Sequence, residues 1–129
     1  MRSVRQYLIE TDVLIDHLTY NGNSFSYLEI AMMKGVCFTT VLNSSELYFF
    51  AKEDFEKEAV DSLMKSLKIL GINSRYSLNV SEFFNKVATV RDALFCSVAK
   101  NNKLPILTGQ TSRYKKTGLK IISLEQLRG

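Results

Sequence analysis

Short apolar runs alternate along this chain with longer segments of helical periodicity, and this alternation is the feature that most restricts its fold. Five runs are short enough to be buried strands: residues 6–9, 36–39, 69–72, 105–108 and 119–122. Helical spacing is found between them, over residues 25–34, 41–51, 55–68, 79–87 and 91–100. Strands that alternate with helices favour a parallel sheet with helices on both faces. The sequence therefore predicts a three-layer α/β/α domain with a mostly parallel central sheet of four to five strands.

Length and composition predict a single domain over residues 1–129, because 129 residues with 46% hydrophobic and 23% charged side chains are typical of one globular unit. The cysteines, Cys37 and Cys96, lie in apolar runs and are expected to be buried free thiols, as in a reducing compartment. The sequence lacks the apolar stretch of a signal peptide or a membrane span. We therefore expect a cytoplasmic protein without membrane contact.

Acidic residues follow the strands or open the helices of this pattern. Glu10 and Asp12 come directly after the first strand, where Thr11 or Asp12 can also cap the next helix. Glu46 shares a predicted helix face with apolar residues, an expensive position for a carboxylate unless it is paired or binds a metal. Asp92 begins the apolar helix 91–100, where the helix dipole favours an acid. Each acid thus also has an ordinary structural explanation as a cap or a solvated residue.

Together these acids predict a metal site, because ligands of parallel sheets bind at the carboxyl ends of the strands. Carboxylates that gather there repel each other, and a hard cation such as Mg²⁺ relieves this repulsion. A metal so held can activate water and stabilise charge on a phosphate, which is the chemistry of a phosphodiester nuclease. Basic residues between 100 and 120, among them Arg113, Lys115 and Lys116, are then candidates to hold the phosphates of a polyanion, as is Arg91, which can instead pair with an acid.

Three blocks of sequence resemble the PIN-domain family, and their layout is similar to that of VapC-type toxins. The opening YLIETDVLID resembles the family's first strand, acid and helix, and FTTVLNSSEL resembles the block that carries its second acid. The stretch RDALFCSVAKNNKLPILTGQ resembles the third block, in which an acid, an apolar helix, a strand and a threonine follow one another. The ending GLKII resembles the last strand.

The resemblance implies an Mg²⁺- or Mn²⁺-dependent endoribonuclease, the toxin of a type II toxin–antitoxin pair, with an antitoxin as protein partner and a homodimer as assembly. It places the family's three acids on Glu10, Glu46 and Asp92, with Asp12 as a further metal ligand. Supporting polar side chains behind these ligands are expected from Thr11, Thr108 and Gln110.

Departures from the family pattern favour a second hypothesis. The first acid is normally Asp and here is Glu10, Gln110 replaces an Asn, and Arg113 stands where a further acid is common. Three acids remain instead of four. A catalytically degenerate PIN domain that binds RNA or a protein is therefore the alternative to a ribonuclease, and an unrelated α/β binding domain is a third possibility. The aromatic run 48–50 together with Phe55 is interpreted as core, with a dimer or antitoxin surface as the alternative.

Overall fold

A computed structural model describes residues 4–129 of the chain. Its centre is a five-stranded sheet in the order β3-β2-β1-β4-β5, and every neighbouring pair of strands is parallel. The strands are β1 (Gln6–Ile9), β2 (Val36–Thr40), β3 (Lys68–Leu70), β4 (Ile106–Leu107) and β5 (Ile121–Ile122). The predicted parallel α/β architecture is therefore confirmed.

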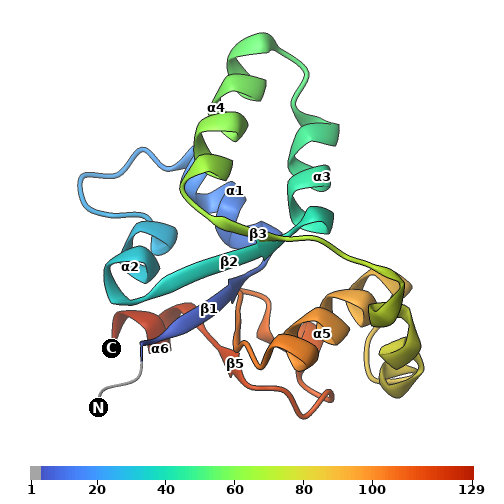
Figure 1. Cartoon of the computed structure of the whole chain (residues 1–129). Helices are drawn as coiled ribbons and strands as arrows, with labels where there is room; N and C mark the ends of the chain where they lie inside the picture. The colour runs from blue at the N-terminus through green and yellow to red at the C-terminus, as the bar shows by residue number, and fades with distance from the viewer. Residues whose placement is uncertain (1–3) are drawn as a thin grey trace.

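Helices cover both faces of this sheet (Figure 1). The elements are α1 (Thr11–Thr19), α2 (Tyr27–Lys34), α3 (Val41–Phe50), α4 (Asp54–Lys65), the 3₁₀ helix η1 (Ser74–Phe83), α5 (Val90–Asn102), the 3₁₀ turn η2 (Thr111–Tyr114) and α6 (Leu124–Arg128). Among residues 4–129, no helix is long and apolar enough to cross a membrane.

Alternate residues of β1 divide the core into two layers. Tyr7 and Ile9 pack with apolar residues of α1, α2, α4 and α6, while Leu8 packs on the other face with α5 and with Tyr114 of η2. Cys37 and Cys96 are free and buried, as predicted, and burial raises the pKa of each thiol to about 12. Apolar side chains therefore cover both faces of β1 over residues 7–9. Polar chemistry is possible only at its carboxyl end, which Glu10 follows.

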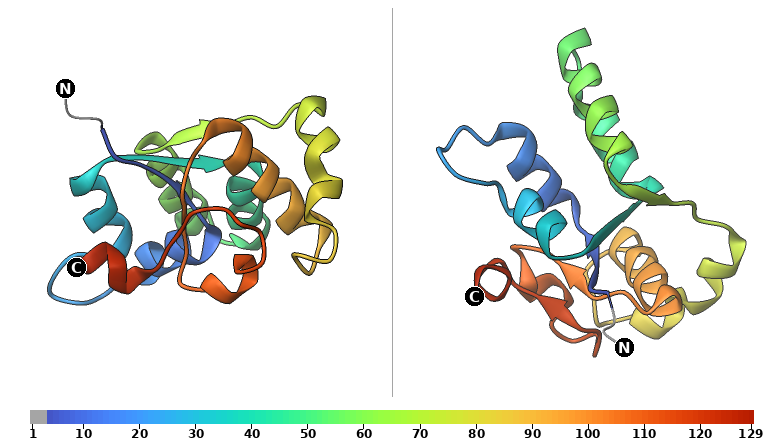
Figure 2. Two further views of the ribbon diagram at one scale, coloured as in Figure 1. Left: turned by 90° about the horizontal axis from the view of Figure 1, so that it is seen from below. Right: turned by 60° about the vertical axis from the view of Figure 1, so that its left-hand side comes forward.

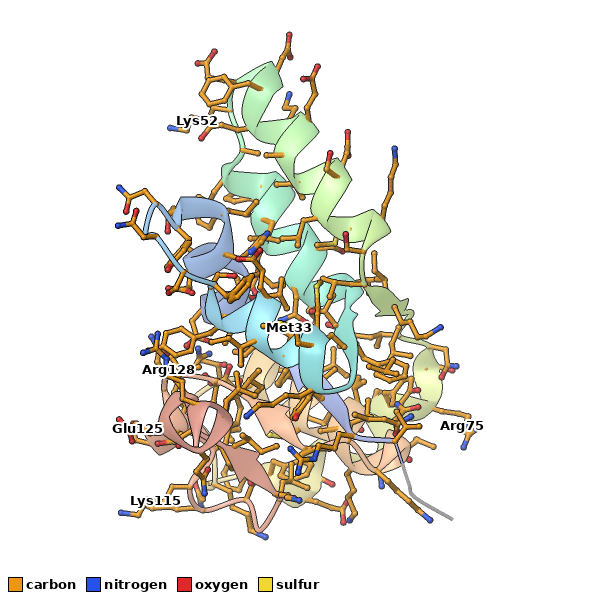
Figure 3. The ribbon with its side chains drawn as sticks, turned by 90° about the vertical axis from the view of Figure 1, so that its left-hand side faces the viewer. Met33, Lys52, Arg75, Lys115, Glu125 and Arg128 are labelled. Atoms are coloured by element: carbon orange, nitrogen blue, oxygen red, sulfur yellow. The ribbon has the colours of Figure 1, made fainter. Side chains whose placement is uncertain are left out.

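The helices α3 and α4 form a hairpin that projects from the carboxyl end of the sheet (Figures 1 and 2). Lys52, between the two helices, lies at the free end of this hairpin (Figure 3). The side chains of Phe49, Phe50 and Phe55 are 80%, 69% and 72% exposed. The interpretation of these aromatic residues as core is therefore wrong, because they lie on the surface of the hairpin.

Two further expectations are corrected by the structure. The N-cap of α1 is Glu10, whose side chain accepts a hydrogen bond from the backbone nitrogen of Thr11, so neither Thr11 nor Asp12 is the cap. The segment predicted to be a helix over residues 79–87 instead contains the end of the 3₁₀ helix η1, which ends at Phe83. Phe83 is buried there, whereas Phe84 is 77% exposed.

Candidate functional site

Three separate segments bring acidic side chains to the carboxyl end of the sheet. Glu10 directly follows β1, Glu46 lies in α3, and Asp92 lies in the first turn of α5. Two of these acids are held by local structure: Glu10 caps α1, and the backbone nitrogen of Asp92 bonds to the capping hydroxyl of Thr89 at 3.1 Å. We call the three side chains of Glu10, Glu46 and Asp92 the acidic centre.

The carboxylate of Glu10 is completely buried and fully hydrogen-bonded. Its Oε1 accepts from the backbone nitrogen of Thr11 and from Asn43 Nδ2, both at 2.9 Å, and from Arg91 Nη2 at 2.6 Å. Its Oε2 accepts from Arg91 Nη1 at 2.8 Å and from the hydroxyl of Tyr114. Charge-assisted bonds of this kind are about twice as strong as bonds between neutral groups.

The guanidinium of Arg91 lies in the middle of the acidic centre and contacts all three carboxylates. Besides its two bonds to Glu10, Nη2 and Nε donate to the two oxygens of Glu46 at 2.6 and 3.1 Å. Nη1 lies 3.2 Å from Asp92 Oδ1. The arginine side chain is only 21% exposed, and its guanidinium carbon stands 5.3 Å from the centre of the Phe95 ring. One cationic group therefore joins the three acids.

A second arginine completes the pairing of Asp92. Arg113 Nη2 donates to Asp92 Oδ1 at 2.5 Å, and its Nη1 lies 4.0 Å from Glu10 Oε2. Within residues 4–129, every buried side-chain nitrogen and oxygen has a hydrogen-bond partner. Two guanidinium groups thus balance most of the charge of the three carboxylates, and the acidic centre is hydrogen-bonded by the chain's own groups.

The pKa values of the centre follow from this pairing. Burial alone would raise the pKa of Glu10, but the hydrogen bonds and charge of Arg91, with smaller contributions from Tyr114 and Thr11, lower it below the ordinary 4.5. Burial would likewise lower the pKa of Arg91, and its bonds to Glu10 and Glu46 instead raise it. Burial and the neighbouring charge of Glu10 raise the pKa of Tyr114. Glu10 is therefore ionised and Tyr114 is a hydrogen-bond donor at neutral pH.

Asp12 lies beside the acidic centre but turns toward the loop after β4. Its Oδ1 accepts from the Thr108 hydroxyl at 3.0 Å, and its Oδ2 accepts from the backbone nitrogen of Gly109 at 2.7 Å. The backbone nitrogen of Gln110 bonds to Thr108 Oγ1 at 3.0 Å, which closes the loop. These contacts tie the end of β4 to the start of α1.

Comparison with known proteins identifies the family of this chain. The sequence matches the family described as PIN domain over residues 7–118. The chain belongs to the PIN domain family. A comparison with curated proteins returns no match.

Several solved structures share this PIN fold at low sequence identity. VapBC2 from Rickettsia felis, bound to a DNA fragment from the promoter, has a TM-score of 0.78 and 14% identity over 92% of this chain and 98% of that one. VapBC-1 from nontypeable Haemophilus influenzae has a TM-score of 0.77 and 13% identity over 93% and 98%. A toxin–antitoxin complex from Klebsiella pneumoniae has a TM-score of 0.71 and 15% identity over 84% and 89%. At these identities the likeness concerns the fold.

The PIN domain resemblance implies a divalent metal, and the acidic centre as it is arranged does not fit one. The donor chemistry is suitable, because carboxylate oxygens are what Mg²⁺ prefers. However, the guanidinium of Arg91 fills the space between the three carboxylates. Among residues 4–129, no group of three or more histidine, cysteine, aspartate or glutamate side chains is arranged to hold a metal ion.

The residues of this PIN domain that were predicted to support the metal ligands or to bind RNA lie partly beside the acidic centre and partly on the surface. Thr11 Oγ1 donates to Glu46 at 2.6 Å and accepts from Arg91 at 3.2 Å. Gln110 is exposed, and its side-chain oxygen accepts from Arg113 at 3.1 Å. Lys115 and Lys116 are also exposed, and Lys115 points away from the body of the protein (Figure 3).

Sequence reasoning missed Asn43 and Tyr114. Asn43 Nδ2 joins Glu10 to Thr11, with bonds of 2.9 Å to each. Its signal was present, because Asn43 stands three residues after Thr40 and forms a capping box with it at the start of α3. Tyr114 is completely buried and reaches Glu10 across more than one hundred residues of sequence, and no local pattern predicts that contact.

An apolar groove of about 660 Å³ adjoins the acidic centre, between α1 and the hairpin of α3 and α4. Its polar end is formed by Thr11, Asp12, Glu46, Arg91 and Arg113. Its apolar walls are formed by Ile15, Leu18, Leu47, Phe50, Phe55 and Val60. Phe50 and Phe55, two of the exposed aromatic residues of the hairpin, thus border this groove.

Proposed function

We propose that this chain is a toxin-type PIN domain that works by binding, with an antitoxin-like protein as its partner and without a resident metal. The single observation that carries the proposal is the position of Arg91, whose guanidinium contacts the carboxylates of Glu10, Glu46 and Asp92 at 2.6 to 3.2 Å. A metal-dependent nuclease needs those oxygens free on the side where the metal binds.

The free energy of the buried ion pairs supports the absence of a resident metal. Breaking a buried ion pair costs about 3–5 kcal/mol, and Glu10 is completely buried while Arg91 is 21% exposed. A dissociation constant of 1 mM corresponds to about 4 kcal/mol of binding free energy. A metal would therefore have to replace the stabilisation that Arg91 gives these carboxylates before it showed any net affinity, and Arg113 adds a second pair that would have to open at Asp92.

The apolar groove supports the protein partner. Phe50 and Phe55 are 69% and 72% exposed along a groove large enough for apolar side chains of another chain. Solved structures of the same fold include a toxin–antitoxin complex. An amphipathic helix with apolar anchors would bury these residues and reach the polar end of the groove. The homodimer that the resemblance implies would use further apolar surface, such as Phe49 at the end of the hairpin.

A second candidate function is an Mg²⁺- or Mn²⁺-dependent endoribonuclease. A specific observation favours it: Glu10, Glu46 and Asp92 come from three segments and still reach one cationic group. In this candidate Arg91 would leave the centre, those three acids would hold the metal, and the bound metal would supply an activated water.

An RNA cleavage assay separates the two candidates. The full chain is incubated with labelled single-stranded RNA and either Mg²⁺ or Mn²⁺, beside the Asp92→Asn variant. The proposal expects no metal-dependent cleavage from either protein. Cleavage that needs Mn²⁺ and disappears in Asp92→Asn would establish the ribonuclease and overturn the proposal.

A binding assay tests the protein partner. The product of each reading frame adjacent to the one that encodes this chain is co-expressed with it, and co-purification is measured for Phe55→Ser. The control is Phe84→Ser, because Phe84 is 77% exposed but lies beyond η1, outside the groove. Loss of the partner with Phe55→Ser alone supports docking in the groove, and equal binding by both variants would refute it.

A further inference from the structure

A basic hollow of about 520 Å³ lies at the amino ends of the strands, opposite the acidic centre. Residues at the start of β1 and Gln126 and Leu127 of α6 line the same hollow. Four basic residues line the hollow, and each comes from a different segment: Arg5 before β1, Lys34 at the end of α2, Lys103 after α5 and Lys120 before β5. The lining contains no acidic residue.

The four cations are not neutralised by the rest of the fold. Within residues 4–129, none of Arg5, Lys34, Lys103 and Lys120 takes part in a salt bridge. This differs from the acidic centre, where both arginines are paired with carboxylates. Like charges around one hollow repel each other, and a polyanion relieves that repulsion.

The backbone holds these cations at fixed places. The carbonyl of Arg5 accepts from Val36 at 2.9 Å, and the carbonyl of Lys120 accepts from Ile106 at 3.0 Å, so both residues are anchored to the sheet. Lys103 ends α5 in the left-handed conformation, with φ 54°. Lys34 Nζ donates to the carbonyl of Leu127, which leaves two of its protons for another acceptor.

The chemistry of the hollow selects an extended anion over a compact one. Arg5, Lys103 and Lys120 are exposed, so their charged ends do not meet at one buried point. Tyr7 in the floor is only 4% exposed, so it offers no aromatic face on which a base can stack. Lysine contacts of this type give affinity for phosphates without sequence information.

We propose that this basic hollow binds the phosphodiester backbone of a single-stranded nucleic acid without base specificity. A single strand can bend its phosphates into a concave surface lined by separated cations. RNA and DNA share that chemistry, and the four basic residues can pair with the phosphates of either. This site is separate from the acidic centre and the apolar groove, so the proposal stands independently of the function proposed above.

The number of basic residues in the hollow predicts how strongly salt weakens the binding of a nucleic acid. For single strands, the logarithm of the association constant changes with the logarithm of salt concentration by about −0.7 for each phosphate that is neutralised. Four contacts therefore predict a slope of about −2.8, or roughly a 50-fold loss of affinity between 50 and 200 mM salt. Removing two contacts predicts a slope of about −1.4 and roughly a 7-fold loss.

The experiment measures fluorescence anisotropy of labelled oligouridylate and oligothymidylate with the full chain. The test variant is Lys103→Gln/Lys120→Gln, which leaves the Lys34 contact in place. The control variant is Lys57→Gln/Lys65→Gln, which removes the same charge from exposed positions of α4, outside the hollow. Thermal melting of both variants checks that their folding is unchanged.

The proposal expects both oligonucleotides to bind alike, with the slope halved by the test variant and unchanged by the control. Equal effects of the two variants would show that only net charge matters and would overturn it. Absence of binding at 50 mM salt would also overturn it. A third refutation would be complete displacement of RNA by inorganic phosphate at equal phosphate concentration, because that outcome indicates a compact anion site.

Discussion

Replacing Arg91 by methionine tests directly whether its guanidinium serves as the cation of the acidic centre. Methionine keeps an unbranched side chain that can still pack on Phe95, so the change removes charge and hydrogen bonds more than volume. The Arg91→Met variant leaves the buried carboxylate of Glu10 with the donors of Asn43, Tyr114 and the Thr11 backbone. It removes both bonds from the guanidinium.

The expected loss of stability follows from burial. Removing one partner of a buried ion pair costs about 3–5 kcal/mol, because the remaining charge is left uncompensated. Glu10 is completely buried, and Arg91 is 21% exposed. The matched control is Lys100→Met, which breaks the pair with Glu82 at 2.5 Å, where the two side chains are 48% and 41% exposed. Exposed pairs contribute about 0–1 kcal/mol, so the control should change stability by that amount.

Urea denaturation at pH 7 measures both variants, with and without Mn²⁺. In Arg91→Met the three carboxylates lose the cation between them, and Mn²⁺ should bind in its place. A ligand at one hundred times its dissociation constant returns about 2.7 kcal/mol of stability. The wild type should gain nothing at the same Mn²⁺ concentration. The double variant Arg91→Met/Asp92→Asn lacks one carboxylate and should lose most of the Mn²⁺ response.

Two results would refute this reasoning about Arg91. The first is a free energy of unfolding for Arg91→Met that falls no further than that of Lys100→Met, which would mean that the guanidinium contributes as little as a surface charge. The second is equal stabilisation of wild type and Arg91→Met by Mn²⁺. That outcome would mean that Arg91 leaves the centre at little cost, and the ribonuclease would become the better proposal.

Three further predictions concern the same network and the backbone. Asn43→Leu removes a donor from buried Glu10 and should lower the free energy of unfolding by about 1–3 kcal/mol in urea titrations. Because the pKa of Glu10 is lowered by folding, its ion pair stabilises the protein above about pH 4.5 and the stabilisation is lost on further acidification; the pH dependence of unfolding should be shallower in Glu10→Gln. Gly118→Ala should destabilise by about 1 kcal/mol because φ is +77°, whereas Gly71→Ala, with open space around it, should not lower the melting temperature.

The sequence was sufficient for the fold where local patterns and packing agree. The run 6–9 is β1 and the apolar segment 91–100 lies within α5, because both are buried and are bounded by polar or capping residues. Over residues 79–87 the local sequence pattern and the packing disagree, because Phe83 is buried and Phe84 is exposed. There the packing of η1 against α5 decides which residues are buried, and a local period cannot reveal it.

The candidate site was predictable in its acids and not in its cations. Residues that follow parallel strands share one edge of the sheet, so the meeting of Glu10, Glu46 and Asp92 follows from their order in the chain. The direction of a long arginine side chain in a first helical turn has no such rule. Arg91 was a candidate for RNA or for an acid, and only the fold places its guanidinium between carboxylates that are 45 and 81 residues away.

Arg91 and Arg113 already relieve the repulsion among the three carboxylates for which a metal was predicted. Clustered carboxylates require positive charge, but two guanidinium groups already face the three acids. The remaining negative charge is met locally, because Glu10 caps α1 and Asp92 lies in the first turn of α5, where helix dipoles favour acids. Arg91 itself lies in that first turn, an unfavourable place for a cation. Its contact with three carboxylates outweighs this cost, so the centre is an internal ion-pair network whose stability does not require a bound ion.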